Sequence, residues 1–297
     1  MHHKANRMST QDQVINIVFH VIAVLMIIAV IYPLWFVIIA SFSNPADVAS
    51  GEVWIWPKEW NLAGYQELFK QPSLWRSYLN TILYTISGTI VALVVNIPAG
   101  YAMSRMDLYG RKWINYFYLV PMFFGGGLIP TYIVIQAFGL YDNPLVMILP
   151  FSVSTYNIIV TRTFFRSNLP QELWEAAQID GCGTFRYFIQ FAVPLSKAIL
   201  AVVGLWTAVG LWNQWFNALI YLQNEAYVPL QLFLRRILIA NQSLLGAATG
   251  TMAQELRQLS DMMKYGSIVI STLPIMCLYP FLQKYFNQGA MVGSVKE

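Results

Sequence analysis

The chain has 297 residues, of which 57% are hydrophobic and only 11% are charged, and its formal net charge is +4. Soluble domains are typically about 25% charged, so this composition indicates an integral membrane protein and excludes an ordinary soluble domain. The basic residues are scattered between apolar segments instead of clustering on one face, so the positive charge does not indicate a nucleic-acid partner.

Six apolar segments are each long enough to cross a bilayer, which takes about 20 residues. In chain order they are Val14–Phe42, Tyr78–Met103, Trp113–Gln136, Pro144–Phe165, Ala198–Leu222 and Tyr265–Gln283. We therefore predict an all-α polytopic membrane protein in which residues 1–297 form a single transmembrane domain of six spans.

The third segment contains three consecutive glycines, Gly125, Gly126 and Gly127. Glycine allows two backbones to approach closely, and it also allows a helix to flex. Close packing is the favoured interpretation, and flexing stays open as the alternative.

The stretch between the fourth and fifth segments, residues 166–197, is polar and has the pattern of a helix–turn–helix. Pro170 suits the first turn of a helix, and Glu172 and Glu175 lie near that N-terminus, where the helix dipole favours negative charge. Gly181 permits the turn that ends the helix. The expected apolar face of this helix consists of Leu173, Trp174, Ala176 and Ala177.

This stretch resembles the EAA loop of the permease subunits of bacterial ABC importers. The matching residues are Glu175, Ala176, Ala177, Asp180, Gly181 and Pro194, and the departures at Cys182, Phe191 and Val193 keep apolar character. Other segments are similar to carbohydrate permeases related to the second maltose permease subunit. They are Ala99–Arg105, Met122–Tyr132, Trp212–Asn217 and the end of the chain from Gln283 to Lys296.

The resemblance implies a type I ABC importer permease fold with a cytoplasmic coupling helix in the 166–197 loop. It implies that Glu175 of this helix contacts an ATPase. The candidate residues for coupling to the ATPase are Glu172, Glu175, Ala176, Ala177, Asp180 and Gly181. The expected partners are a second homologous permease subunit, two ATP-binding subunits that hold ATP and Mg, and an external solute-binding protein. The chain has no Gly-x-x-x-x-Gly-Lys-Ser/Thr motif, so we expect no enzyme activity, cofactor or metal site of its own.

An oligosaccharide passage needs aromatic rings for the C–H faces of the sugar and amides for its hydroxyl groups. Trp206 and Asn213 would share a face of the fifth span, since they are about two helical turns apart. The full set of candidates is Trp206, Trp212, Asn213, Phe216 and Asn217, with Tyr132 in the third span and Tyr156 and Asn157 in the fourth. For any single residue, packing between helices stays open as the alternative.

Lys and Arg are more frequent on the side that holds both termini and the 166–197 loop. The positive-inside rule therefore places both termini in the cytoplasm. The resemblance to ABC importer permeases implies that the chain lies in the inner membrane. Two alternatives stay open: an ABC permease for a non-sugar solute, and an ion-coupled secondary sugar carrier. No acidic or basic residue lies deep within a predicted span, which disfavours the carrier.

Overall fold

The computed structural model describes residues 10–247 and 258–277, and these residues form helices and connecting loops without any strand. The first helices are α1 (Thr10–Ser41), α2 (Pro45–Ala49), α3 (Ala63–Phe69), α4 (Pro72–Ser104), α5 (Arg111–Phe123) and α6 (Leu128–Ala137). They are followed by η1 (Pro144–Met147), α7 (Leu149–Ser152), α8 (Thr155–Asn168), α9 (Gln171–Ile179), α10 (Thr184–Tyr187), the π-helical turn η2 (Phe188–Ala192) and α11 (Val193–Leu195). The last are α12 (Lys197–Trp212), α13 (Phe216–Tyr221), η3 (Glu225–Tyr227), α14 (Leu230–Ala247) and a helix at 258–277.

Among the described residues, α1 and α4 are each long and apolar enough to cross a membrane as single helices. Three further candidates are helix pairs with a sharp bend: α5 with α6 (117°), residues 144–152 with α8 (41°), and residues 184–195 with α12 (80°). The third and fourth predicted spans are therefore broken helices. The sixth predicted span, Tyr265–Gln283, extends beyond the residues that the structure describes.

The break between α5 and α6 contains the three glycines. A Cβ added at Gly125 or Gly127 would meet nothing within 4 Å, and Gly127 has a positive φ of 84°. The favoured interpretation of these glycines as a close-packing surface is therefore wrong within the described residues. Their backbone freedom instead allows the chain to turn between the two helices.

The described residues divide into two compact units, one formed by residues 10–70, 238–247 and 258–270 and the other by residues 71–237 and 271–277. In the first unit, Tyr65 stacks on Phe42 at 5.2 Å and donates a hydrogen bond to Ser41 Oγ at 2.8 Å. Gly64 lies so close to Met262 that an added Cβ would be 2.7 Å from the Met262 Cβ. These contacts attach α3 to the end of α1 and to the helix at 258–277.

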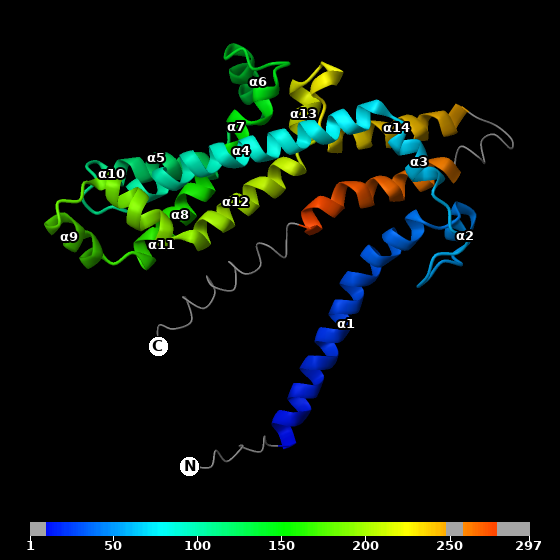
Figure 1. Cartoon of the computed structure of the whole chain (residues 1–297), viewed down its shortest axis with the longest axis horizontal. Coiled ribbons are helices and arrows are strands. Elements are labelled where there is room, and N and C mark those ends of the chain that lie inside the picture. Colours follow the sequence, from blue (N-terminus) through cyan, green and yellow to red (C-terminus); the bar gives the residue numbers. More distant parts are fainter. Residues whose placement is uncertain (1–9, 248–257, 278–297) are drawn as a thin grey trace. The chain divides into compact units, whose positions relative to one another are not determined.

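The second unit is built on α4, which packs along α8 and α12 (Figure 1). Small residues allow this close packing, because a Cβ added at Gly100 of α4 would lie 2.6 Å from the Thr161 Cβ of α8. Small residues at helix crossings are the usual device of membrane bundles, since interior packing, and not the exclusion of water, drives association in lipid. One end of this bundle carries α9 and α10 (Figure 1).

Asn96 of α4 is completely buried and holds the break between α7 and α8. Its Nδ2 donates to the Ser152 carbonyl at 3.0 Å, and its Oδ1 accepts from the Ser154 N–H at 3.1 Å. Irregular backbone at membrane depth must be satisfied by protein groups, because lipid offers no hydrogen-bonding partners. Asn96 supplies a donor and an acceptor at the point where the helical bonds stop.

Candidate functional site

The first candidate site is α9, whose ends follow the local sequence. Pro170 precedes the helix, and Gly181 ends it with a positive φ of 73°. The Gly181 N–H donates to the Gln178 carbonyl at 3.0 Å, and the Cys182 N–H donates to the Ala177 carbonyl at 2.9 Å. This pair of bonds is the Schellman arrangement, which needs a left-handed residue at the position of Gly181.

One face of α9 belongs to the core of its unit. Trp174 is 5% exposed and Ala177 is 8% exposed, and both pack in one cluster with residues of α4, α8, α10, η2 and α12. The small side chain of Ala177 thus lets α9 pack closely on the core of its own unit. Ala176 lies on the exposed side of the helix, so its expected place on the apolar face was wrong.

The opposite face of α9 mixes acidic and apolar side chains. Glu172, Glu175 and Asp180 are exposed there, and none of them forms an ion pair within the described part of the chain. Ile179 is 87% exposed on this face, and Phe185 of α10 is 78% exposed. Exposed apolar residues bordered by acids are typical of a surface that another protein covers.

Ile179 was not predicted as part of this exposed face, although the helical period places it there. At about 100° per residue, Ile179 lies only about 20° around the helix from Glu172. The same spacing puts Ala176 on the side of Glu172, away from the arc of Trp174 and Ala177.

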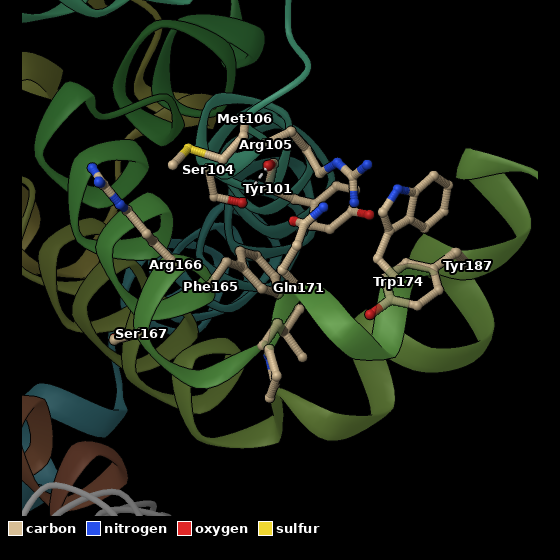
Figure 2. Close-up of a pocket in the computed structure, with 12 residues that line it drawn as sticks. Tyr101, Ser104, Arg105, Met106, Phe165, Arg166, Ser167, Gln171, Trp174 and Tyr187 are labelled. Atoms are coloured by element: carbon tan, nitrogen blue, oxygen red, sulfur yellow. Dashed lines mark hydrogen bonds between the residues drawn. The ribbon is translucent and has the colours of Figure 1, made fainter. Parts of the chain in front are cut away.

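An arginine at the end of α4 attaches α9 to the bundle. The Arg105 guanidinium lies 4.0 Å from the ring centroid of Trp174, and the Trp174 ring packs edge-on against Tyr187 at 5.0 Å (Figure 2). Arg105 also donates two hydrogen bonds to Asp107, at 3.0 and 2.9 Å. These hydrogen bonds hold the pKa of the Asp107 carboxyl below its usual range.

A cavity of about 390 Å³ lies beside this attachment and is lined by residues of α4, α8 and α9 (Figure 2). Ser104, Phe165 and Gln171 are among its lining residues. Helix α9 therefore does not fill the space between the ends of α4 and α8 completely.

The second candidate site is a pocket of about 460 Å³ in the same unit. It brings together four of the pathway candidates, from α8, α12 and α13. Its lining residues are Phe151, Ser154, Tyr156, Asn157, Trp206, Thr207, Gly210, Leu211, Gln214 and Asn217. The wall is therefore aromatic, amide and hydroxyl in character, and none of its residues carries a charge.

Two breaks in helices open this pocket. Ser154 lies between α7 and α8, and Gln214 lies between α12 and α13. The Tyr156 and Trp206 rings face each other at 5.5 Å, while Asn157 Nδ2 donates to Thr207 Oγ1 at 3.4 Å. The Gln214 Oε1 atom is buried without a hydrogen-bond partner among the described residues. Broken helices around a polar pocket are a common architecture of substrate sites in transporters.

The other pathway candidates do not line this pocket. Trp212 is 5% exposed and donates its indole N–H to the Ser271 carbonyl at 2.9 Å, while Asn213 bonds back to the Val209 carbonyl. Phe216 packs edge-on against Trp215, and Tyr132 stacks on Tyr221 at 5.9 Å. Trp206 lines the pocket and Asn213 does not, because the Asn213 amide folds back onto the Val209 carbonyl of its own helix.

The pocket also contains three lining residues that were not predicted from the sequence: Ser154, Thr207 and Gln214. Thr207 directly follows Trp206, and Gln214 lies in the segment that resembles other permeases, so each had a neighbouring signal.

The model of the family described as "Binding-protein-dependent transport system inner membrane component" matches residues 88–292. The chain belongs to this family. It is accordingly a membrane component of a transport system, and the matched region contains both candidate sites.

Relatives of this permease cover nearly its whole length. It is 38% identical over 266 residues to protein LplC of Bacillus subtilis. The aligned region covers 90% of this chain and 89% of LplC. It is 34% identical over 266 residues to the polygalacturonan/rhamnogalacturonan transport system permease protein YtcP of the same organism, covering 90% of this chain and 92% of YtcP.

The permease also resembles a solved structure. A chain in the crystal structure of a bacterial ABC transporter involved in the import of the acidic polysaccharide alginate superposes with a TM-score of 0.84 at 28% identity. The match covers 95% of this permease and 100% of that chain. The all-α architecture is therefore that of an ABC importer permease.

Proposed function

We propose that this permease forms one half of the translocation pathway of an ATP-driven importer of oligosaccharides. The observation that carries the proposal is the uncharged pocket of aromatic, amide and hydroxyl side chains at two helix breaks. Its composition suits the C–H faces and hydroxyl groups of a sugar. The relatives support this cargo, since YtcP is named for polygalacturonan and rhamnogalacturonan transport and the similar structure for alginate import.

The proposal includes an assembly of several subunits. A second, homologous permease completes the pathway, two ATP-binding subunits hold ATP and Mg, and an external solute-binding protein delivers the sugar. The chain crosses the membrane six times with both termini in the cytoplasm. Support for this topology comes from α1, α4 and the three bent helix pairs, each long and apolar enough for one span, and from the distribution of Lys and Arg.

The exposed face of α9 is the proposed contact with the ATP-binding subunits. Glu172, Glu175 and Asp180 present carboxylates without an ion pair among the described residues, and basic groups of a partner can bind them. Ala176 and Ile179 add apolar surface between them. Gly181 and Ala177 support this contact surface indirectly. Gly181 ends the helix, and Ala177 packs the helix on the core.

Two arginines of α14 bear on whether the sugar is acidic. Arg235 lies over the Trp215 ring at 3.7 Å, and Arg236 forms an ion pair with Glu225 at 2.6 Å. Both arginines are thus engaged within the chain, and the pocket itself holds no cation. Burying a carboxylate without a partner is costly, so this pocket suits the neutral parts of a sugar chain.

The test is the ATPase activity of the purified complex with candidate oligosaccharides and the binding protein. Trp206→Ala should raise the sugar concentration needed for half-maximal stimulation about tenfold, equivalent to ~1.4 kcal/mol. The matched control is Phe138→Ala, which removes a ring that is 77% exposed outside the pocket. An unchanged response in Trp206→Ala would remove the pocket from the pathway. Stimulation only by a non-sugar solute would overturn the cargo.

Glu172→Ala with Glu175→Ala tests the coupling face. The double variant should keep its basal ATPase rate in the assembled complex and lose most of the stimulation by sugar and binding protein. Stimulation equal to that of the wild type would show that α9 does not transmit the signal.

A further inference from the structure

Arginines gather where α5 begins and α8 ends. Arg162 and Arg166 are one helical turn apart on α8, and Arg111 is the first residue of α5, which packs on α8. Arg162 lies within electrostatic reach of both of the others. The three guanidinium groups therefore form a cationic cluster, which we call the arginine cluster.

No acid neutralises this cluster within the described part of the chain. The carboxylates that do form ion pairs there are bound by other basic residues, and none of them pairs with Arg111, Arg162 or Arg166. Arg111 contacts the Met106 sulfur at 2.6 Å. Like charges at an i,i+4 spacing destabilise a helix, so an anion bound between these groups would stabilise this end of the unit.

The aromatic residues of α5 indicate where that anion comes from. Trp113 is 78% exposed and Tyr116 is 61% exposed, in the first and second turns of the helix. Trp and Tyr at the end of an apolar helix are typical of the membrane–water interface. The phosphate groups of phospholipids lie at this level, and basic pockets between spans bind anionic head groups.

We propose that the arginine cluster of Arg111, Arg162 and Arg166 is a binding site for the phosphate head group of an anionic phospholipid. Arginine suits this role because its planar fork donates two parallel hydrogen bonds to a phosphate. The proposal rests on the part of the proposed function that places α5 and α8 in the membrane. It is independent of the sugar cargo and of the pocket.

The site would stabilise the attachment of α9. Arg166 lines the cavity beside α9, together with Arg105 and Trp174. A lipid bound at the arginine cluster would fix the end of α8, which forms one wall of this cavity. Anionic lipid should therefore raise the thermal stability of the complex as well as remain bound to it.

The experiment compares the purified complex in nanodiscs of phosphatidylcholine alone and of phosphatidylcholine with phosphatidylglycerol. Native mass spectrometry counts the phosphatidylglycerol that remains bound, and a titration gives its apparent affinity. Arg162→Gln with Arg166→Gln should weaken this affinity roughly 30-fold, which is what two basic residues contribute at an anionic surface. The matched control, Arg186→Gln with Lys197→Gln, removes the same charge outside the cluster and should bind lipid like the wild type.

Two further arms make the result decisive. Arg162→Lys with Arg166→Lys keeps the charge and should retain most of the lipid, so a loss in the glutamine variant cannot be assigned to misfolding alone. Inorganic phosphate added to phosphatidylcholine nanodiscs should not reproduce the stabilisation by phosphatidylglycerol. Equal lipid retention in wild type and glutamine variant, or full replacement of the lipid by inorganic phosphate, would overturn the proposal.

The sugar-stimulated ATPase rate of the same samples separates the two proposals. A complex that retains lipid through the arginine cluster but ignores oligosaccharide would refute the cargo and leave the lipid site intact. A complex that responds to sugar and loses no lipid in the glutamine variant would refute the lipid site alone.

Discussion

Replacing Asn96 by alanine tests a fully buried polar contact of the helical core. Asn96 is 0% exposed and bonds to two backbone groups at the break between α7 and α8, the Ser152 carbonyl and the Ser154 N–H. Alanine keeps the helical propensity of α4 and removes both bonds. The substitution therefore isolates the two hydrogen bonds that let the fourth predicted span be discontinuous.

The magnitude depends on what the two backbone groups do afterwards. Leaving a buried donor or acceptor unsatisfied costs about 1–3 kcal/mol, so two of them would cost about 2–6 kcal/mol. Hydrogen bonds between membrane helices average only about 0.6 kcal/mol when the freed groups find new partners. Ser154 lies outside both helices and has no helical acceptor for its N–H, so we expect at least about 2 kcal/mol.

Thermal unfolding of the purified complex measures this cost. At about 2–4 °C per kcal/mol for a chain of this size class, Asn96→Ala should lower the Tm by at least about 4 °C. Asn168→Ala is the matched control, because the Asn168 side chain bonds only to neighbouring residues of its own helix. It should cost at most about 0.5 kcal/mol. A Tm of Asn96→Ala equal to that of the control would refute the assignment of Asn96 as the support of the break.

Other predictions concern the end of α4 and its packing. Because Arg105 lowers the pKa of Asp107, the pair stabilises the fold above the ordinary carboxyl value of about 3.9, and this contribution is lost as the pH falls through the lower folded value. Wild type should therefore melt above Asp107→Asn at pH 7, and the difference should close in acid; a gap that does not depend on pH would contradict this. Gly100→Val should prevent assembly or lower the Tm severely, because its first side-chain carbon would collide with Thr161; normal expression and Tm would show that α4 and α8 can separate freely.

The apolar segments could be predicted from the sequence because hydropathy depends only on composition. Helix continuity could not, since the breaks at 124–127, 153–154 and 213–215 lie inside segments that remain apolar on average. A helix can break where another side chain offers hydrogen bonds to the backbone groups that lose their helical partners. For Ser152 and Ser154 that partner is Asn96, which is distant in sequence and carries no local mark of this role.

The candidate sites show the same limit. Glu172 and Glu175 could be found from the motif and the helical period, because exposure on a short helix follows from spacing alone. The attachment of α9 by Arg105 could not, since it depends on the chain returning to the end of α4. Trp206 and Asn217 were predicted from residue type and line the pocket, whereas Asn213 does not line it, because its side chain bonds to the Val209 carbonyl of its own helix.

Asn96 of α4 supports the break beside the pocket, and Arg105, which directly follows the last residue of α4, holds α9. If motion of α9 reaches the pocket along α4, losses at these two positions interrupt one series of contacts, and their effects on coupling should not add. The test is a double-mutant cycle on sugar-stimulated ATPase activity with Arg105→Gln, Asn96→Ala and the combined variant. The combined variant should be little worse than the more damaging single one. Effects that multiply as independent losses would show that α9 and the pocket communicate by another route, because spatial continuity alone is no evidence of coupling.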